Sequence, residues 1–230
     1  MITLYQYKNG YRYNSDTIFL YDFISSKKPK GKVLDVGSGC GVLGLLIKRD
    51  FENIELFSID IQDKNSKLTQ KNADVNSLEV KVLNGDFLNY DFEERFDFVI
   101  SNPPFYNQGA KKSEDRSLYL SRHSDALPFY DFAKKVYAVL KPKGSFIFCY
   151  DAKQTDIIFS SLLELRFKVN SMKFIHPKRE KDASLIMVEA RRESKSLSRV
   201  EPPLVVFDED RYSLEAQKIF EKARTNSVDL

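Results

Sequence analysis

The chain has 230 residues, 42% of them hydrophobic and 30% charged, a composition that can bury one sizeable core. No apolar run reaches the length of a membrane span, and the N-terminal residues lack the basic start and apolar stretch of a secretory signal, so a cytoplasmic protein without membrane contact is expected. Two cysteines without metal-ligand spacing argue against a disulfide framework and a bound metal, and the formal charge of +3 permits a polyanionic partner without requiring one.

Strand-like and helix-like segments alternate along the chain. Short apolar runs predict strands over Lys32–Val36, Ile54–Asp60, Val80–Leu83, Phe96–Ser101 and Ser145–Tyr150. Helical length and composition predict helices over Val42–Arg49, Gln62–Asn76, Pro128–Leu140 and Ile157–Leu165. A final pair of strands is predicted over Lys168–Ile175 and Ser184–Ala190. This alternation predicts an α/β fold in which βαβ units form a parallel sheet with helices on both faces.

A glycine-rich turn follows the first of these strands. The stretch DVGSGCGVLG, Asp35 to Gly44, lets the backbone approach a ligand closely and opens a helix with free N–H groups. Asp60 ends the next strand, where a carboxylate can accept hydrogen bonds from both hydroxyls of a ribose. Because ligands of such sheets bind beyond the carboxyl ends of the strands, the pair predicts an adenosine-containing cofactor. A tight turn and a helix cap are the purely structural explanation of the same residues.

Two classes of cofactor fit this turn. Gly39 to Gly44 matches the G-x-G-x-x-G fingerprint, and Asp60 has the acidic spacing that accompanies it, so a nicotinamide-dependent oxidoreductase is a rival hypothesis. Asp35 argues against a dinucleotide, because a carboxylate at the strand end would repel a pyrophosphate. It could instead receive an ammonium group, directly or through water, and the methionine moiety of S-adenosylmethionine carries one.

The turn resembles the first motif of the Rossmann-like methyltransferases, E/D-x-G-x-G-x-G, which reads here DVGSGCG from Asp35 to Gly41. The resemblance spans roughly Gly31 to Ala190. It implies a seven-stranded, mostly parallel sheet with an antiparallel last strand. It also implies S-adenosyl-L-methionine as the cofactor, bound by Asp35, Gly37, Ser38, Gly39, Gly41 and Asp60.

The fourth predicted strand runs into a motif with a chemical explanation. In FDFVISNPPFYNQ, two prolines remove backbone donors where the strand would continue, so the strand ends there. The stretch Asn102-Pro103-Pro104-Phe105 resembles the motif with which amino-methyltransferases hold a planar target nitrogen, usually adenine N6. The Asn102 side-chain oxygen and the Pro103 carbonyl would accept the two N–H bonds of the amine, and Phe105 would stack on the base. The alternative is that these residues have no chemical role and only form the turn that ends the strand.

Further cofactor contacts are implied by the same resemblance. Asp86, in LNGDF, corresponds to the acidic residue that contacts the adenine amine of the cofactor, and is otherwise a turn aspartate. The stretch YRYNSDT resembles the N-terminal segment that closes over the methionine end of the cofactor, with Tyr13, Asp16 and Thr17 as contacts. The sequence Asn14-Ser15-Asp16 is also typical of an ordinary helix N-cap.

The expected organisation is one domain with an extension at each end. Residues 1–30 would form the N-terminal segment that closes over the cofactor site, and residues 31–192 the catalytic methyltransferase domain. A polar, proline-ended connection, RRESKSLSRVEPP, leads into the C-terminal extension over residues 193–230. This extension is expected to pack on the same domain.

A long polar loop, Asn107–Leu127, follows the NPPF motif, and loops of this length beside an active site are often lids or binding elements. Its candidate RNA-binding residues are Lys111, Lys112, Arg116, Arg122 and His123. A second basic group could reach phosphates or could be solvated charges: Lys173, Lys178, Arg179, Lys181, Arg191 and Arg192.

Three further stretches of the sequence point to a more specific group of methyltransferases. They are GYRYNSDTIFLYDFI, SRHSDALPF and RYSLEAQKIFEKA. Together they resemble the bacterial tRNA adenine-N6 methyltransferases that modify the adenosine beside the anticodon of valine tRNA. The resemblance implies tRNA as the partner of a methyltransferase, and no obligate protein partner is evident.

Other functions remain open at this point. Within the methyltransferases, the runner-up targets are an adenine or guanine amine of ribosomal RNA and the side-chain amide of a protein glutamine. More distant alternatives are the NAD-dependent oxidoreductase and a non-catalytic RNA-binding module. The intact Asp35, Asp60 and Asn102 argue against the RNA-binding module, because such a module would not need them.

Overall fold

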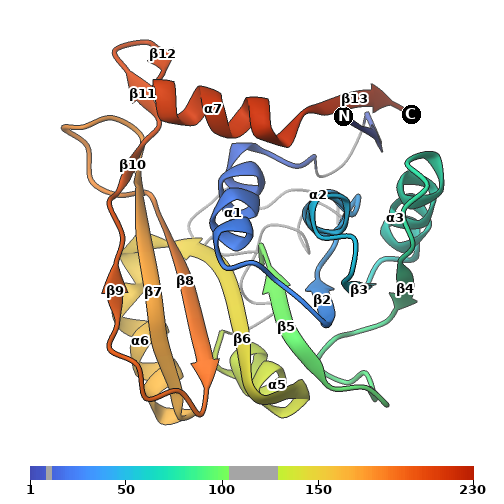
Figure 1. Ribbon diagram of the computed structural model, residues 1–230, viewed down its shortest axis with the longest axis horizontal. Coiled ribbons are helices and arrows are strands. Elements are labelled where there is room, and N and C mark those ends of the chain that lie inside the picture. Colours follow the sequence, from blue (N-terminus) through green and yellow to red (C-terminus); the bar gives the residue numbers. More distant parts are fainter. Residues whose placement is uncertain (9–11, 104–128) are drawn as a thin grey trace, which may run out of the picture.

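The computed structural model describes residues 1–8, 12–103 and 129–230. Its centre is a sheet with the strand order β10-β7-β8-β6-β5-β2-β3-β4, and β9 also pairs with β7 (Figure 1). The strands of this sheet are β2 Lys32–Val36, β3 Glu55–Asp60, β4 Lys81–Asn84, β5 Phe96–Ser101, β6 Leu140–Asp151, β7 Phe167–His176, β8 Leu185–Arg192, β9 Arg199–Val200 and β10 Leu204–Val205.

The direction of the strands confirms the predicted α/β class. Strands β4, β3, β2, β5 and β6 are parallel to one another, whereas β8 is antiparallel to both β6 and β7. The described sheet has nine strands rather than seven, because the two-residue strands β9 and β10 add to the free edge of β7. Two residues carry no readable apolar pattern, so a sequence gives no sign of such strands.

Helices cover both faces of the sheet (Figure 1). The helices α1 Ser15–Ser26, α2 Val42–Asp50 and α7 Leu214–Ala223 lie on one face, and α5 Phe129–Val139 and α6 Thr155–Glu164 lie on the other. Helix α3, Asp63–Val75, packs beside β3 and β4. The helix predicted over Pro128–Leu140 is confirmed as α5, and its apolar residues Phe129, Phe132, Ala133 and Val136 share one buried face, as a 3.6-residue period requires. Leu140, which was expected on the same face, is also buried but is the first residue of β6.

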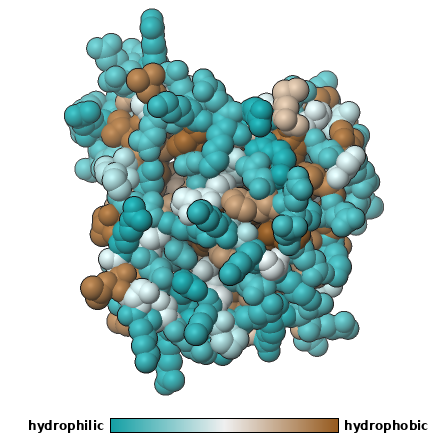
Figure 2. Space-filling view, in the orientation of Figure 1, coloured by the Kyte–Doolittle hydropathy of each residue, from teal (hydrophilic) through white to brown (hydrophobic). Residues whose placement is uncertain are grey.

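Figure 2 shows a mainly hydrophilic face on which the hydrophobic side chains are scattered rather than gathered in one patch. In the described ranges, none of the helices combines the length and the apolar character needed to cross a membrane.

The order of the strands reverses between β2 and β5. From β2 the chain adds β3 and β4 on one side, and then returns to add β5 and β6 on the other side. The crevice at such a reversal, beyond the carboxyl ends of the strands, is the usual ligand site of this fold class. The ends of β2 and β5 are joined there, because the Ser101 hydroxyl donates to the Val36 carbonyl at 2.8 Å.

The two ends of the chain meet at the surface of the domain. Strand β1, Ile2–Gln6, pairs in parallel with β13, Thr225–Asp229, and Figure 1 shows the two termini close together. Before them, a small hairpin of β11 Phe207–Asp208 and β12 Arg211–Tyr212 leads into α7, which packs against α1.

Two asparagines of the α3 region bind the free edge of β1. The Asn72 carboxamide accepts from the Tyr5 N–H at 2.8 Å and donates to the Tyr5 carbonyl at 3.1 Å. Asn76 makes the same pair of hydrogen bonds with Thr3, at 2.8 and 2.7 Å. The spacing fits, because four residues of a helix rise about 6 Å and two residues of a strand about 6.7 Å. Strand β1 therefore has hydrogen-bond partners on both of its edges.

Replacing Asn72 tests this attachment. Asn72 is fully buried, and its amide also donates to the Cys40 carbonyl at 2.8 Å. Asn72→Ala leaves three backbone groups without this partner, two in Tyr5 and one in Cys40, so we expect a loss of roughly 2–4 kcal/mol in the free energy of unfolding. Urea titration followed by circular dichroism measures it.

The control for this experiment is Gln70→Ala, in the same helix. Gln70 is exposed and donates only to Asp74 among the described hydrogen bonds, so its replacement should change stability by less than about 0.5 kcal/mol. Equal effects of the two variants would mean that the Asn72 bonds contribute little to the fold.

Candidate active site

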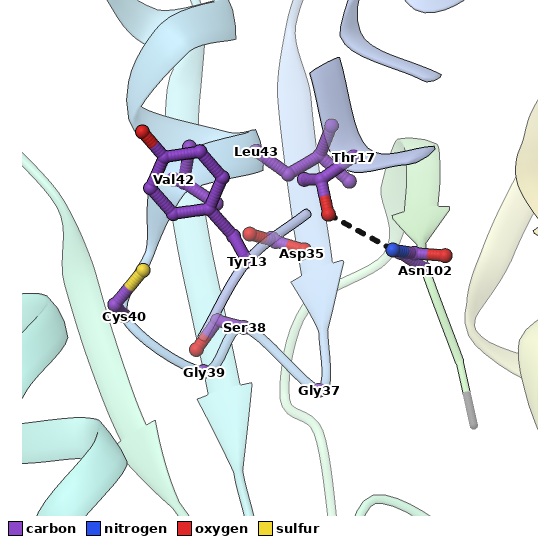
Figure 3. A pocket seen from close by; sticks show the side chains of 10 residues that line it. All are labelled: Tyr13, Thr17, Asp35, Gly37, Ser38, Gly39, Cys40, Val42, Leu43 and Asn102. Carbon is purple, nitrogen blue, oxygen red and sulfur yellow. Dashed lines mark hydrogen bonds between the residues drawn. The ribbon is translucent and has the colours of Figure 1, made fainter. Parts of the chain in front are cut away.

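A pocket lies at the carboxyl ends of β2 and β5 and at the start of α2 (Figure 3). Its walls come from the N-terminal segment, the glycine turn and the end of β5. The lining residues are Tyr13, Thr17, Asp35, Gly37, Ser38, Gly39, Cys40, Val42, Leu43 and Asn102. The structure thus brings together most of the residues that the sequence assigns to the cofactor, and adds the first residue of the NPPF motif.

The glycine turn needs glycine for conformation and for space. Gly39 and Gly41 have φ of 59° and 81°, in the left-handed region that other residues rarely adopt. A Cβ on Gly41 would also lie 2.8 Å from Cγ2 of Thr69. The turn therefore packs closely on α3, which a larger residue at position 41 would prevent.

Polar residues of α3 hold the turn in place, and sequence analysis did not find them. The Thr69 hydroxyl donates to the Gly39 carbonyl at 3.1 Å, and Asn72 donates to the Cys40 carbonyl. Asn65, one turn earlier, donates to the Asp60 carboxylate at 3.1 Å. Their spacing of four and three residues puts all three on one face of the helix. This spacing was the only sign in the sequence that they could act together.

Asp35 is a buried carboxylate in the wall of the pocket. It is 1% exposed, and its Oδ2 accepts from the Gly44 N–H at 3.0 Å. Burial raises its pKa to about 7, the hydrogen bond from Gly44 opposes the shift, and the charge of Asp60 adds to it. In the free protein the carboxyl is therefore partly protonated near neutral pH, and a bound cation would favour its charged form.

Asp60 is fixed at the end of β3. Its Oδ2 accepts from the Gly39 N–H at 2.9 Å, and its Oδ1 accepts from the Gln62 N–H at 2.9 Å and from Asn65. Burial raises its pKa, although these hydrogen bonds act in the other direction. The carboxylate thus ties the glycine turn to the start of α3, and each of its oxygens can still accept a further hydrogen bond.

Asn102 begins the NPPF motif, at the end of β5. Its amide nitrogen donates to the Thr17 hydroxyl at 2.9 Å, and Figure 3 shows the oxygen on the side away from Thr17. This Oδ1 is buried and has no hydrogen-bond partner among the described residues. A buried carbonyl without a partner is costly, so the site holds an acceptor ready for a donor. Pro103 is also buried.

Two further residues that the sequence assigns to the cofactor, Asp86 and Asp16, do not line the pocket. Asp86 accepts from the Leu88 N–H at 3.1 Å and from Asn89 at 2.6 Å, within its own turn. Asp16 accepts from Asn14 at 2.8 Å, and burial raises its pKa. Their contacts with a cofactor stay predictions. Outside the described residues lie Pro104, Phe105, Lys111, Lys112, Arg116, Arg122 and His123.

The second basic group is largely engaged within the protein. Lys173 pairs with Glu215 at 3.0 Å, and Lys178 pairs with Asp210 at 3.1 Å. Arg191 and Arg192 donate to backbone carbonyls, at 2.9 Å and 3.0 Å for their shortest bonds. This group therefore gives little support to a phosphate-binding surface. Within the described ranges, no cluster of His, Cys, Asp and Glu could hold a metal ion.

Asp35→Asn tests the charge in the pocket. The folded pKa of about 7 lies above the ordinary value of 3.8, so the folded protein binds more protons than the unfolded chain between these pH values. Stability should therefore fall as pH rises through this window, by roughly 4 kcal/mol in total, and stay low above it. Asparagine keeps an acceptor for the Gly44 N–H and cannot ionise. The variant should be more stable than wild type at pH 8 and should lack this slope in urea titrations from pH 4 to pH 8.

Asp91→Asn is the matched control, because Asp91 is exposed and lies away from the pocket lining. It should leave the pH profile of stability unchanged. If Asp35→Asn and wild type have the same pH profile of stability, burying the charged form of Asp35 costs little free energy in the free protein.

The chain is similar to known methyltransferases. Residues 12–120 match the family model described as methyltransferase small domain. A tRNA1(Val) (adenine(37)-N6)-methyltransferase of Pedobacter heparinus is 31% identical over 150 residues, which cover 64% of this chain and 63% of that protein. Its namesake from Actinobacillus pleuropneumoniae is 27% identical over 220 residues, 94% of this chain and 91% of that protein.

Two further likenesses bear on the reaction class and the fold. The ribosomal RNA small subunit methyltransferase C of Actinobacillus pleuropneumoniae is 38% identical over 90 residues, 39% of this chain and 27% of that protein. The crystal structure of a predicted O-methyltransferase from Agrobacterium tumefaciens covers 94% of this chain and 100% of its own, with a TM-score of 0.71 and 16% identity. At this identity the likeness shows the fold, which is the Rossmann-like methyltransferase fold expected from the sequence.

The residues of the pocket fit S-adenosylmethionine, since Asp35 is a buried carboxylate in its wall that could pair with a cation, and the glycine turn is open to a ligand. Asp60, at the end of β3, does not line the pocket but is hydrogen-bonded to the turn through Gly39. Residues 12–120 match the methyltransferase small domain, and together with the relatives named above this match identifies the chain as an S-adenosylmethionine-dependent methyltransferase.

Proposed function

We propose that this protein transfers a methyl group from S-adenosylmethionine to the exocyclic N6 amine of an adenosine in tRNA, beside the anticodon of valine tRNA. The observation that carries the proposal is the Asn102 carboxamide, whose buried oxygen has no partner among the described residues. The relatives named for this reaction support the choice of substrate, because one of them aligns over 94% of this chain. Such a substrate would place the enzyme in the cytoplasm.

Asn102 would act on the amine of the target base. An exocyclic amine conjugated to a purine is a poor nucleophile, because its lone pair is delocalised into the ring. The Asn102 oxygen and the Pro103 carbonyl would accept its two N–H bonds and favour the pyramidal nitrogen of the transition state. Thr17 holds the amide end of Asn102, so the oxygen is already oriented. Bound S-adenosylmethionine would supply the electrophilic methyl group and leave as S-adenosylhomocysteine. The methylated amine would then lose one proton to solvent, so a strong general base is not required.

The two carboxylates would hold the cofactor. Asp35 would receive the ammonium group of the methionine end, which would favour ionisation of a carboxyl whose pKa is raised in the free protein. Asp60 would accept hydrogen bonds from the ribose hydroxyls. The glycine turn lies between them, because Gly39 donates to Asp60 and the helix that follows the turn donates to Asp35 through Gly44.

Ribosomal RNA is the second candidate substrate. The local match to a ribosomal RNA methyltransferase has the higher identity, 38%, but it covers only 39% of this chain. The tRNA methyltransferases align over residues outside this shared part, where substrate recognition would differ between the two groups. We therefore favour tRNA. The loop residues Lys111, Lys112, Arg116, Arg122 and His123 remain our prediction for contacts with its phosphates.

The substrate is tested with purified enzyme and labelled S-adenosylmethionine. Unmodified valine tRNA should accept the methyl group, and mass spectrometry of the nucleosides should find N6-methyladenosine beside the anticodon. A small-subunit ribosomal RNA fragment and a valine tRNA with that adenosine changed to guanosine serve as controls. Methylation of the ribosomal fragment alone would favour the second candidate.

Asn102→Ala tests the catalytic group. Losing one preorganised partner of a transition state typically lowers the rate by about 10²–10³-fold, and we expect a loss of this size in single-turnover methyl transfer. Affinity for S-adenosylhomocysteine and for tRNA should change little, because the proposed bond strengthens only in the transition state. Asn102→Asp keeps an acceptor and should retain partial activity.

A conservative change at Thr17 separates orientation from chemistry. Thr17→Val keeps the shape of the side chain but removes the acceptor for the Asn102 amide, so the rate should fall by a smaller factor, about tenfold. Thr17→Ser should restore most of it. If Asn102→Ala transfers methyl at nearly the wild-type rate, the NPPF motif is only the end of a strand and the proposed mechanism is wrong.

A further inference from the structure

One face of β13 binds the segment that forms a wall of the pocket. The Tyr13 hydroxyl lies 3.1 Å from Oγ1 of Thr225 and 3.1 Å from Oγ of Ser227. Next to it, Arg12 forms an ion pair of 2.6 Å with Asp229. Residues 225, 227 and 229 alternate along the strand, so their side chains share one face. The last strand of the chain thus holds residues 12 and 13 at three positions.

Gln6 of β1 adds a second connection to the same segment. Its carboxamide oxygen accepts from the backbone N–H of Tyr13 at 3.1 Å, and its nitrogen donates to the Ser227 hydroxyl at 2.9 Å. The side chain is only 3% exposed, so it is fixed by these partners rather than by water. Backbone and side chain of Tyr13 are therefore both held by the β1–β13 pair.

The pair is itself anchored to the glycine turn. Asn72 of α3 binds both backbone groups of Tyr5 in β1 and also donates to the Cys40 carbonyl in the turn. One buried side chain thus contacts β1 and the pocket wall at once. The position of β13 is in this way fixed relative to the turn that would hold the cofactor.

Tyr13 has a position suited to a ligand contact. It lines the pocket with Val42 and Cys40, and Figure 3 shows its hydroxyl directed away from Asp35 and Asn102. The ring therefore forms the wall, whereas the hydroxyl serves to anchor it outside the pocket. Nothing in the local sequence around Tyr13 indicates that its anchor lies more than 200 residues away.

We infer that β13 is a functional part of the cofactor site, with Thr225 and Ser227 as positioning residues that hold the Tyr13 ring in the pocket wall. The inference rests on the proposed function only through the identity of the cofactor. A ring that is fixed before the ligand arrives loses less conformational freedom on binding, so the anchor should increase affinity for S-adenosylmethionine and S-adenosylhomocysteine. The C-terminal strand then contributes to cofactor binding without lining the pocket itself.

The test measures the dissociation constant of S-adenosylhomocysteine by calorimetry with the full chain. Thr225→Val preserves shape and strand propensity and removes the hydroxyl that contacts Tyr13. Affinity should fall by roughly fivefold, the effect of one hydrogen bond. Thr225→Ser keeps the hydroxyl and should bind as wild type. The matched control is Asn226→Ala, whose exposed side chain lies on the opposite face of β13 and should have no effect.

A double-mutant cycle makes the test specific for the Tyr13 contact. Tyr13→Phe removes the anchored hydroxyl and should weaken binding about five- to thirtyfold, because it loses both contacts. In the Tyr13→Phe background, Thr225→Val should have no further effect, since no hydroxyl remains to be held. Additive losses in the double variant would show that Thr225 acts by another route and would overturn the inference.

The inference is also overturned if Thr225→Val lowers the melting temperature while the dissociation constant stays at the wild-type value, because the contact then serves only stability. Failure of the proposed function has a different signature. Wild-type protein that binds S-adenosylhomocysteine but methylates no tRNA would contradict the substrate, and the comparison of dissociation constants would still decide the role of β13.

Discussion

Two carboxylates buried at the ends of adjacent strands are the constraint on which the rest of the site depends. Asp35 and Asp60 are 1% and 7% exposed, and in the described part of the chain neither forms an ion pair. Backbone N–H groups of Gly39, Gly44 and Gln62 offset part of the cost of burying them. A ligand that brings a positive charge to Asp35 and hydroxyl donors to Asp60 would offset the cost that remains.

The two carboxylates can serve this purpose only if the turn between them is rigid. The turn has left-handed glycines, which are flexible in an unfolded chain, so its rigidity must come from outside. Helix α3 provides it through Thr69 and Asn72, which bind carbonyls of the turn. Asn102 follows the same rule, since its orientation depends on Thr17 in another segment. In both cases a group with a proposed chemical role is oriented by a side chain from another segment of the chain.

The sequence predicted what depends on short-range pattern. The strand Phe96–Ser101 agrees at both ends, and the glycine turn with Asp60 was found because its residues lie within one βαβ unit. It did not predict β9 and β10, which are too short for any pattern, nor the supporting face of α3, whose polar residues look like those of a solvated helix. The contact between Thr17 and Asn102 joins residues 85 positions apart. Such pairs follow from tertiary packing, which no local window of sequence contains.

The arrangement of the chain ends follows from the same requirement for support. A pocket at the edge of an open sheet has walls on the strand and helix sides, but its outer wall must come from a segment without a place in the sheet. Tyr13 belongs to such a segment, and the loss of conformational entropy on ordering it must be offset by contacts elsewhere. Strands β1 and β13 supply these contacts, and α3 fixes β1 through Asn72. Because that same asparagine binds the glycine turn, loosening of the termini and loosening of the cofactor turn should be energetically coupled.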